Sequence, residues 1–173
     1  QERLHHLESQ VRDMLIFARG EAPLHDDVSV EDLFVGLQAA MEVPLAQYHA
    51  QCDVRIDAPE ARLMCNRDAL ISALMNLINN ALESCQAPIV LAVCADVTAN
   101  GLLRIRVIDN GPGLTAEQKT HMLEPFFTTK SNGTGLGLAV VQAVVRAHHG
   151  EFSLTDNEIA GVSANLLLPL ARN

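Results

Sequence analysis

Three short blocks between residues 109 and 138 contain the residue types from which a nucleotide-binding site could be built. The first is Asp109-Asn-Gly-Pro-Gly113, and the last is Gly133-Thr-Gly-Leu-Gly-Leu138. Between them lies Glu124-Pro-Phe-Phe-Thr-Thr-Lys130. A carboxylate can accept hydrogen bonds from a base, and backbone N–H groups in a glycine-rich segment can bind phosphates. In this order, the blocks predict a base site and a phosphate site with a mobile lid between them.

Asp109 follows a predicted strand and precedes a glycine-rich turn. An Asp-Asn-Gly sequence is a common turn in any protein, and by itself that explanation is preferred. In a nucleotide site, Asp109 would accept a hydrogen bond from an exocyclic amine, which distinguishes adenine from guanine. Gly111 and Gly113 would let the backbone approach the base without a Cβ in the way.

The segment from Gly133 to Gly137 opens a predicted helix. Free N–H groups at a helix start, together with the helix dipole, form an anion site. The spacing is not that of a Walker loop or a dinucleotide fingerprint, so this segment alone is weak evidence. Lys130 either reaches a phosphate from the lid or is an exposed loop lysine.

Asn76 and Asn80 lie four residues apart on a predicted helix, and therefore on the same face. They could be two asparagines on a solvated stripe. Alternatively, their carbonyl oxygens could hold a Mg2+ ion that bridges phosphates, because magnesium prefers hard oxygen ligands and shares its shell with substrate phosphates.

The elements that must position these residues follow from hydrophobic periodicity. Helices are expected over residues 30–48 and 66–84, with Ser29 and Asn66 as N-caps. A short helix is expected over 116–123 and a further helix over 136–148. Strands are expected over residues 54–56, 89–97, 102–108, 152–155 and 162–168, with a hairpin at Asn100-Gly101. The total predicts an α+β sandwich in which helices cover one face of a mostly antiparallel sheet.

Residues 1–19 predict a further helix whose apolar stripe has heptad spacing. The stripe consists of Leu4, Leu7, Val11, Met14 and Ala18. It suits a helical hairpin or a coiled coil, and it needs a partner to be stable in water. Neither His5 nor His6 has the neighbouring residues expected around a histidine that accepts a phosphoryl group. His148 and His149 end the last helix, where capping with partial positive charge is favoured.

Composition restricts the class of protein. The chain has 173 residues, of which 49% are apolar and 3% aromatic, so we expect one domain with an aliphatic core plus an appendage. A net charge of −9 argues against nucleic acid as a partner. The four cysteines lack C-x-x-C spacing, which favours buried free thiols in a reducing cytosol.

The sequence contains no apolar run of transmembrane length and no signal peptide. Because it begins at Gln1 without an initiator Met, we expect a fragment of a cytoplasmic protein, and a membrane anchor upstream is left open.

Taken together, these blocks resemble the catalytic and ATP-binding domain of a bacterial two-component sensor histidine kinase. Residues 76–83 resemble the N box of that family, residues 109–113 the G1 box, residues 124–130 the F box and residues 133–138 the G2 box. The resemblance covers roughly residues 27–173 and implies the Bergerat (GHKL) fold, a two-layer α/β sandwich. The lid is most similar to the nitrogen-regulation type, and residues 12–20 are similar to flagellar-regulation sensor kinases.

The resemblance implies a role for each candidate residue. Asn80 would be the principal Mg2+ ligand with Asn76 supporting it, and Asp109 would bind the adenine N6 amine. The catalytic set would be Asn76, Asn80 and Lys130. The nucleotide-binding set would be Asn80, Asp109, Gly111, Gly113, Phe126, Phe127, Thr128, Thr129, Thr134, Gly135, Leu136 and Gly137.

Related chaperone and DNA-repair ATPases carry a Glu where this chain has Asn76, and that Glu acts as a general base for water. An amide cannot take a proton at neutral pH, so the substitution disfavours hydrolysis and favours phosphoryl transfer to a histidine. The resemblance therefore implies a protein-histidine kinase module that donates the γ-phosphoryl group of ATP.

The resemblance also implies a domain division and partners. Residues 1–20 resemble the second helix of a dimerisation and phosphotransfer hairpin, residues 21–28 a linker, and residues 29–173 the catalytic domain. The helix with the phosphoacceptor histidine is absent, so autophosphorylation of this chain alone is not expected. Expected partners are the protein's own hairpin, in a full-length homodimer, and a response-regulator receiver domain. A nucleotide-dependent binding switch without phosphotransfer is the alternative. A serine kinase that antagonises a sigma factor would leave the heptad helix unexplained.

Overall fold

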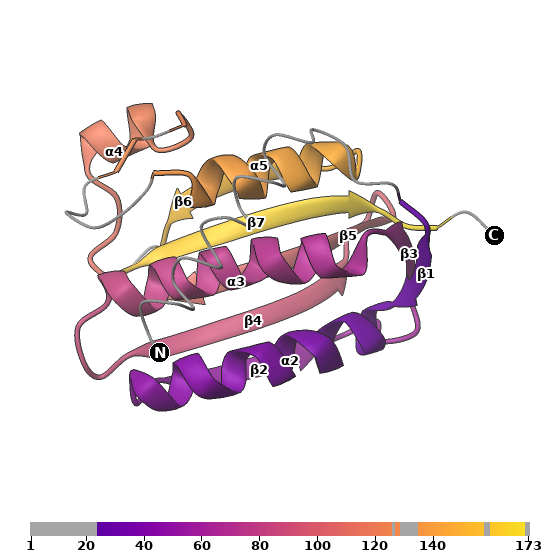
Figure 1. Cartoon of the computed structure of the whole chain (residues 1–173), viewed down its shortest axis with the longest axis horizontal. Helices are drawn as coiled ribbons and strands as arrows, with labels where there is room; N and C mark the ends of the chain where they lie inside the picture. Colours follow the sequence, from indigo (N-terminus) through magenta and orange to yellow (C-terminus); the bar gives the residue numbers. More distant parts are fainter. Residues whose placement is uncertain (1–23, 126, 129–134, 158–159, 172–173) are drawn as a thin grey trace.

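In the part of the chain that the structure describes, three helices cover one face of a five-stranded sheet, and a fourth, short helix lies at one end (Figure 1). The computed structural model describes residues 24–125, 127–128, 135–157 and 160–171. The helices are α2 (Val30–Gln47), α3 (Arg67–Ser84), α4 (Ala116–His121) and α5 (Gly137–Ala147). The strands are β1 (Asp26–Ser29), β2 (Gln51–Ile56), β3 (Arg62–Cys65), β4 (Val90–Val97), β5 (Leu102–Asp109), β6 (Glu151–Asp156) and β7 (Val162–Pro169).

The main sheet is mixed but mostly antiparallel, in the order β2-β4-β5-β7-β6. Only the β2–β4 pair is parallel, and the other three pairs are antiparallel. The expected β4–β5 hairpin is present, and Gly101 at its turn has a positive φ of 75°. The predicted α+β sandwich is confirmed. β2 begins three residues earlier than expected, and α4 ends two residues earlier.

A second, two-stranded sheet was not predicted. β1 and β3 pair antiparallel, and Val28 lies opposite Leu63 in a register that buries both side chains. β1 begins at Asp26, inside the stretch 21–28 that the sequence suggested as a linker. This strand could not be recognised from the sequence, because it begins with the polar residues Asp26 and Asp27 and only its third residue contributes to the core.

The core between helices and sheet is aliphatic, as composition predicted. Alternate residues of β5 (Leu103, Ile105 and Val107) are buried against the helix layer. α3 buries the predicted set Leu70, Leu74, Leu77, Ile78 and Ala81. Phe34 is the only aromatic side chain in the buried core of the described residues.

Side-chain caps fix where the helices begin. Ser29 Oγ accepts the N–H of Asp32 at the start of α2, and Asn66 Oδ1 accepts the N–H of Ala69 at the start of α3. Both caps were predicted. Thr115 and Gln118 form a reciprocal capping box at the start of α4. Side chains of the protein itself therefore cap the starts of these three helices.

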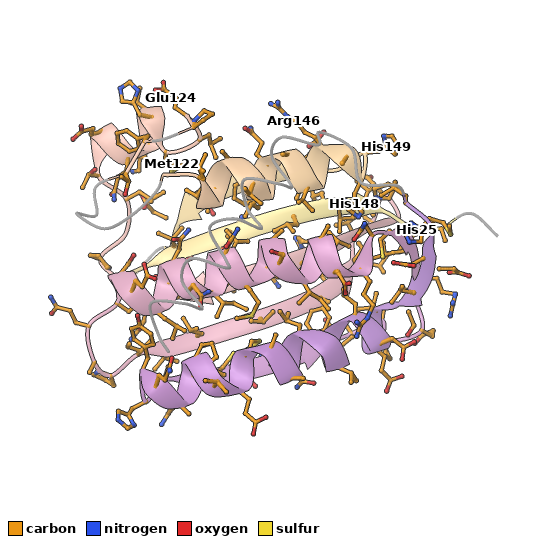
Figure 2. The ribbon with its side chains drawn as sticks, viewed as in Figure 1. His25, Met122, Glu124, Arg146, His148 and His149 are labelled. Atoms are coloured by element: carbon orange, nitrogen blue, oxygen red, sulfur yellow. The ribbon has the colours of Figure 1, made fainter. Side chains whose placement is uncertain are left out.

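His148 joins the C-terminal end of α5 to the start of α3. It is 4% exposed; its Nδ1 lies 2.7 Å from the Val144 carbonyl, and its Nε2 lies 3.0 Å from the Asn66 nitrogen. Because Nε2 accepts from an N–H, the ring is neutral with its proton on Nδ1. Burial also lowers the pKa of His148. The expectation of a positive charge at this helix end was therefore wrong for His148. The next residue, His149, points outward (Figure 2).

Candidate functional site

The C-terminal ends of α3 and β5 and the N-terminal end of α5 lie at one end of the molecule, next to α4 (Figure 1). We call this the Asp109 end. The opposite end, where α3 begins and α5 finishes, is called the His148 end. Figure 2 shows Met122 and Glu124, which follow α4, far from His148. Nearly all predicted site residues that the structure describes belong to the Asp109 end.

The C-terminal half of α3 carries two predicted site residues, and one of them, Asn80, lies beside the start of α5. Asn76 and Asn80 are both half-buried, one turn apart, beside the fully packed Leu77 and Ile78. A Cβ built on Gly137, the first residue of α5, would lie 3.8 Å from Asn80 Nδ2. The structure therefore brings Asn80 and the glycine-rich helix start together, although they are 57 positions apart in the sequence.

Asp109 is held at the end of β5 by backbone groups on two sides. Its Oδ1 accepts the N–H of Gly111 at 2.8 Å and the N–H of Val162 at 3.2 Å. Its carbonyl accepts from Asn157 Nδ2 at 3.1 Å. A Cβ on Gly161 would lie 1.9 Å from that carbonyl oxygen, so only glycine permits this approach. The carboxylate is thus oriented before any ligand arrives.

The turn after β5 is tied to the loop that leaves α3. Asn110 Nδ2 donates to the Pro88 carbonyl at 2.8 Å, and Asn110 Oδ1 accepts the Val90 N–H at 3.0 Å. The Cys85 thiol packs beside the same turn. Burial, followed by the charge of Asp109 and a hydrogen bond to it, raises the pKa of Cys85 to about 11. These contacts fix the helix that carries Asn80 relative to the strand that carries Asp109.

The segment that leads into α4 is fixed by Asp156 at the end of β6. Gly113 has a φ of 81°, and the next N–H, that of Leu114, donates to Asp156 Oδ1 at 3.0 Å. Lys119 of α4 forms an ion pair with the other oxygen of Asp156. The Lys119 hydrogen bond holds the pKa of Asp156 below its usual value. Asp156 was missed in the sequence because it lies 42 positions from Leu114 and in no motif.

α5 begins without a side-chain cap. Leu136 occupies the N-cap position and carries no side-chain oxygen, and Gly135 before it has a φ of 68°. The first N–H groups of an α-helix have no partner within the helix, and they attract anions together with the helix dipole. The other three described helices have side-chain caps at this position. The uncapped start is therefore suited to a phosphate.

The lid residues are only partly described. Phe127 lies against His121 of α4, with ring centroids 5.7 Å apart, and His121 Nδ1 is 3.0 Å from Glu124 Oε1. Thr128 is the last described residue of the block. Four expected site residues lie outside the described residues: Phe126, Thr129, Lys130 and Thr134.

The available ligands suit a magnesium ion shared with a nucleotide. The described residues contain no cluster of three His, Cys, Asp or Glu side chains that could hold a metal by themselves. Mg2+ does not require such a cluster, because it usually takes one or two protein oxygens and completes its shell with phosphates and water. The carboxamide oxygens of Asn76 and Asn80 are hard ligands of this kind, so the donor set fits.

Comparison with known proteins identifies the family. Residues 65–172 match the family described as histidine kinase-, DNA gyrase B-, and HSP90-like ATPase. The chain therefore belongs to this family of ATPases, which have the GHKL fold expected from the sequence.

Its relatives narrow the class to catalytic domains of sensor histidine kinases. The chain is 48% identical over 171 residues to the sensor protein kinase FleS of Pseudomonas aeruginosa, covering 98% of this chain and 41% of that protein. It is 37% identical over 108 residues to the sensor histidine kinase ZraS of Escherichia coli K12, covering 62% of this chain and 23% of that protein. The expected likeness to flagellar-regulation sensor kinases fits the match with FleS. The chain thus spans less than half the length of these relatives.

Solved structures of histidine kinases have the same fold as this chain. The catalytic domain of histidine kinase ThkA superposes with a TM-score of 0.74 at 25% identity, over 83% of this chain and 94% of that one. Full-length ShkA, solved in complex with AMPPNP, superposes with a TM-score of 0.82 at 24% identity, over 97% of this chain and 36% of that one. Within the ranges that the structure describes, no helix combines the length and apolar character needed to cross a bilayer.

Proposed function

We propose that the chain binds Mg2+-ATP at the Asp109 end and donates the γ-phosphoryl group to a histidine on a separate helix. The observation that carries this proposal is the meeting of three elements at that end. The Asn80 side chain faces the uncapped start of α5, and the loop leaving α3 is tied to the turn that follows Asp109.

Recognition of the base depends on Asp109. Because Oδ1 is already occupied by two backbone N–H groups, the carboxylate has a fixed orientation and can accept the N6 amine of adenine. Gly111 and Gly113 keep the turn free of side chains that would block the base plane. Guanine presents a carbonyl at the same ring position and would face the carboxylate with like polarity.

The phosphates would extend from the base toward α5. Thr134, Gly135, Leu136 and Gly137 would supply N–H groups at the helix start, and Lys130 would add a positive charge from the lid. Phe126 and Phe127, with Thr128 and Thr129, would close over the nucleotide. A Mg2+ ion held by Asn80 and supported by Asn76 would neutralise charge on the phosphates. Catalysis then consists of positioning and charge neutralisation.

The side chains near the phosphates favour transfer over hydrolysis. By the resemblance to chaperone and DNA-repair ATPases, Asn76 would stand where their Glu activates water, and a carboxamide cannot take a proton at neutral pH. The acceptor imidazole carries its own nucleophilic nitrogen, so the pocket need only hold the γ-phosphorus in line with it.

The partners follow from the class of the relatives. We propose that the acceptor histidine lies on the protein's own dimerisation hairpin, to which residues 1–20 contribute one helix. We also propose that the full-length protein is a homodimer and that this domain lies in the cytoplasm. The phosphoryl group would pass from the histidine to an aspartate of a response-regulator receiver domain. The net charge of −9 argues against a nucleic-acid partner, because nucleic-acid phosphates are bound by basic surfaces.

The test is to mix this chain with γ-labelled ATP, Mg2+ and a separate phosphoacceptor hairpin from the full-length protein. An acid-labile label on the hairpin is expected, and it should be absent when the acceptor histidine is replaced by glutamine. ATP binding without a labelled hairpin would instead favour the alternative function, a nucleotide-dependent binding switch. Absence of ATP binding would contradict both.

A further inference from the structure

Asp156, the last residue of β6, contacts two parts of the segment that follows the turn at Asp109. Its Oδ1 accepts the N–H of Leu114 at 3.0 Å, and its Oδ2 forms an ion pair with Lys119 Nζ. A Cβ built on Gly113 would lie 3.4 Å from the same Oδ1. One carboxylate therefore lies against the end of the proposed base-site turn and also holds the helix α4 that comes after it.

α4 is not held in place by core packing. The structure describes all six of its residues, and none of their side chains is buried. The capping box of Thr115 and Gln118 is internal to this segment and does not connect it to the sheet. A helix this short is not stable by its backbone alone, so contacts of its surface side chains must fix its position. The ion pair of Lys119 with Asp156 is such a contact, and it reaches from α4 to the end of β6.

The ion pair is too exposed to add much to the stability of the whole fold. The side chains of Asp156 and Lys119 are 38% and 52% exposed, and ion pairs in such surroundings contribute little to folding. The hydrogen bond from Lys119 lowers the pKa of Asp156, so the carboxylate is ionised at neutral pH. The effect expected of the pair is therefore local: it restricts where α4 and the backbone at Leu114 lie.

That restriction matters because Gly113 ends the turn in which the base is proposed to bind. Gly113 has a φ of 81°, and from it the chain runs on to α4. The beginning of the turn is held by Asn110, which contacts Pro88 and Val90. Asp156 holds the other end. A turn that is ordered before the ligand arrives loses less conformational freedom on binding, and the affinity is higher for that reason.

We propose that Asp156 is a positioning residue for nucleotide binding, which keeps the end of the base-site turn and α4 in place through the Leu114 N–H and the Lys119 ammonium group. This inference rests on the proposed function, because it takes the turn at Asp109 to be the adenine site. It extends that function by assigning part of the affinity for ATP to a residue that lies outside the sequence motifs and does not touch the nucleotide.

The experiment is a double-mutant cycle on the two side chains of the ion pair. Calorimetry gives the affinity for Mg2+-ATP of the wild-type chain, Asp156→Asn, Lys119→Met and the double variant. Asp156→Asn removes the charge but keeps an oxygen that can accept the Leu114 N–H, whereas Asp156→Ala removes both. Lys119→Arg keeps the positive charge. Thermal unfolding of the same samples establishes that each variant is folded.

A matched control pair lies at the His148 end. Arg62 of β3 and Asp27 of β1 have side chains that are 48% and 55% exposed, and their ion pair also joins segments distant in the sequence. β1 and β3 lie at the opposite end of the molecule from α4 (Figure 1). Arg62→Met and Asp27→Asn therefore remove an exposed ion pair in the same way, away from the proposed base site.

Asp156→Asn and Lys119→Met should each weaken ATP binding by about 2- to 5-fold, the range expected for one exposed ion pair. The double variant should bind no more weakly than either single variant, because both remove the same interaction. Asp156→Ala should bind more weakly than Asp156→Asn, since the Leu114 N–H also loses its acceptor. Lys119→Arg and both control variants should bind ATP as the wild type does.

Salt distinguishes an electrostatic positioning role from a general structural one. Raising the salt concentration from about 50 mM to about 500 mM should remove most of the coupling between Asp156→Asn and Lys119→Met, because salt screens exposed charges. The salt dependence of the nucleotide's own charges is common to all four corners of the cycle and cancels. Side chains that only pack against each other would keep their coupling in high salt.

Equal affinity of the wild-type chain and folded Asp156→Ala would overturn the inference. Additive losses in the cycle would overturn it as well, because the two side chains would then act independently. The same weakening in the control variants would show that the effect is not particular to the Asp109 end, and the inference would again fail. In each of these cases the wild-type chain binds ATP and the proposed function stands. If the wild-type chain does not bind ATP, the proposed function fails and this inference fails with it.

Discussion

The two ends of the α3–α5 helix pair are built in opposite ways. At the His148 end, the donors and acceptors are paired within the protein: Asn66 caps α3, and His148 accepts the Asn66 N–H while donating to Val144. At the Asp109 end, α5 starts without a side-chain cap, and α3 presents the carboxamide of Asn80 toward that start. The contacts named at the His148 end are made within the protein, whereas the Asp109 end brings together residues of the proposed nucleotide site.

This difference shows how a single pair of helices can serve both stability and binding. The contacts at the His148 end help to fix the spacing of α3 and α5, and with it the position of Asn80 beside the start of α5. Sites that bind ligands are commonly drawn from the less stable part of a structure. The comparison predicts that substitutions at the Asp109 end change function first, and that substitutions at the His148 end change stability first.

The largest effect is expected for Asn80→Ala. Without its carboxamide oxygen, the Mg2+ geometry on which in-line transfer depends is lost, and phosphotransfer should fall by about 100-fold or more. The measurement is label on the acceptor hairpin over time, with thermal unfolding of the same sample. Asn79→Ala is the matched control, since it removes the same group from the adjacent position of α3. Retained transfer in Asn80→Ala would contradict the assignment.

Asp109→Asn should have the next largest effect. The amide can present a donor to the N6 amine, so ATP binding should weaken by about 1–3 kcal/mol, the cost of a mispaired buried polar group. Calorimetric titration with Mg2+-ATP measures this directly. Asp53→Asn, an exposed carboxylate on β2, is the control and should bind ATP normally. An unchanged affinity in Asp109→Asn would refute the adenine role.

Most of the Asp109 end could be predicted from the sequence because its groups lie in short, local motifs. Periodicity also placed α2, α3, α5 and the main sheet. Cys85, Asp156 and the Gly161 contact could not be found, because each meets its partner through the fold: Gly161 approaches Asp109 from 52 positions away. A single sequence shows that a glycine is present, but not which carbonyl it lies against.

The His148 end was less predictable for a related reason. β1 and β3 have four residues each, too few to show periodicity, and their pairing joins distant segments. His148 was expected at the helix end, but its charge depends on its burial and on Asn66, 82 positions away. Local position alone suggested the opposite protonation state.

His148→Leu should lower stability while leaving nucleotide affinity unchanged. It keeps apolar volume at the site but leaves the Asn66 N–H without its acceptor, which costs about 1–3 kcal/mol when the donor is buried. Urea unfolding gives the free energy of unfolding, and ATP titration of the folded variant gives the affinity. His149→Asn is the control, because His149 has a φ of 57°, which asparagine tolerates. A large loss of ATP affinity in folded His148→Leu would break the distinction between the two ends.

The smallest expected effect is a pH dependence of stability that originates at His148. Burial lowers the pKa of His148 from its ordinary value of 6.5, so the unfolded chain binds a proton more readily than the folded one. The contribution of His148 is therefore fully present above about pH 6.5 and is lost as the pH falls toward the folded-state pKa, with a slope of at most about 1.4 kcal/mol per pH unit. Protonation would also fill the Nε2 lone pair that the Asn66 N–H occupies. Urea unfolding between pH 8 and pH 5 should thus show the gap between wild type and His148→Leu narrowing as the pH falls. A gap that stays constant would mean that His148 binds its proton equally well in the folded and the unfolded chain, and that the His148 end does not depend on a neutral imidazole.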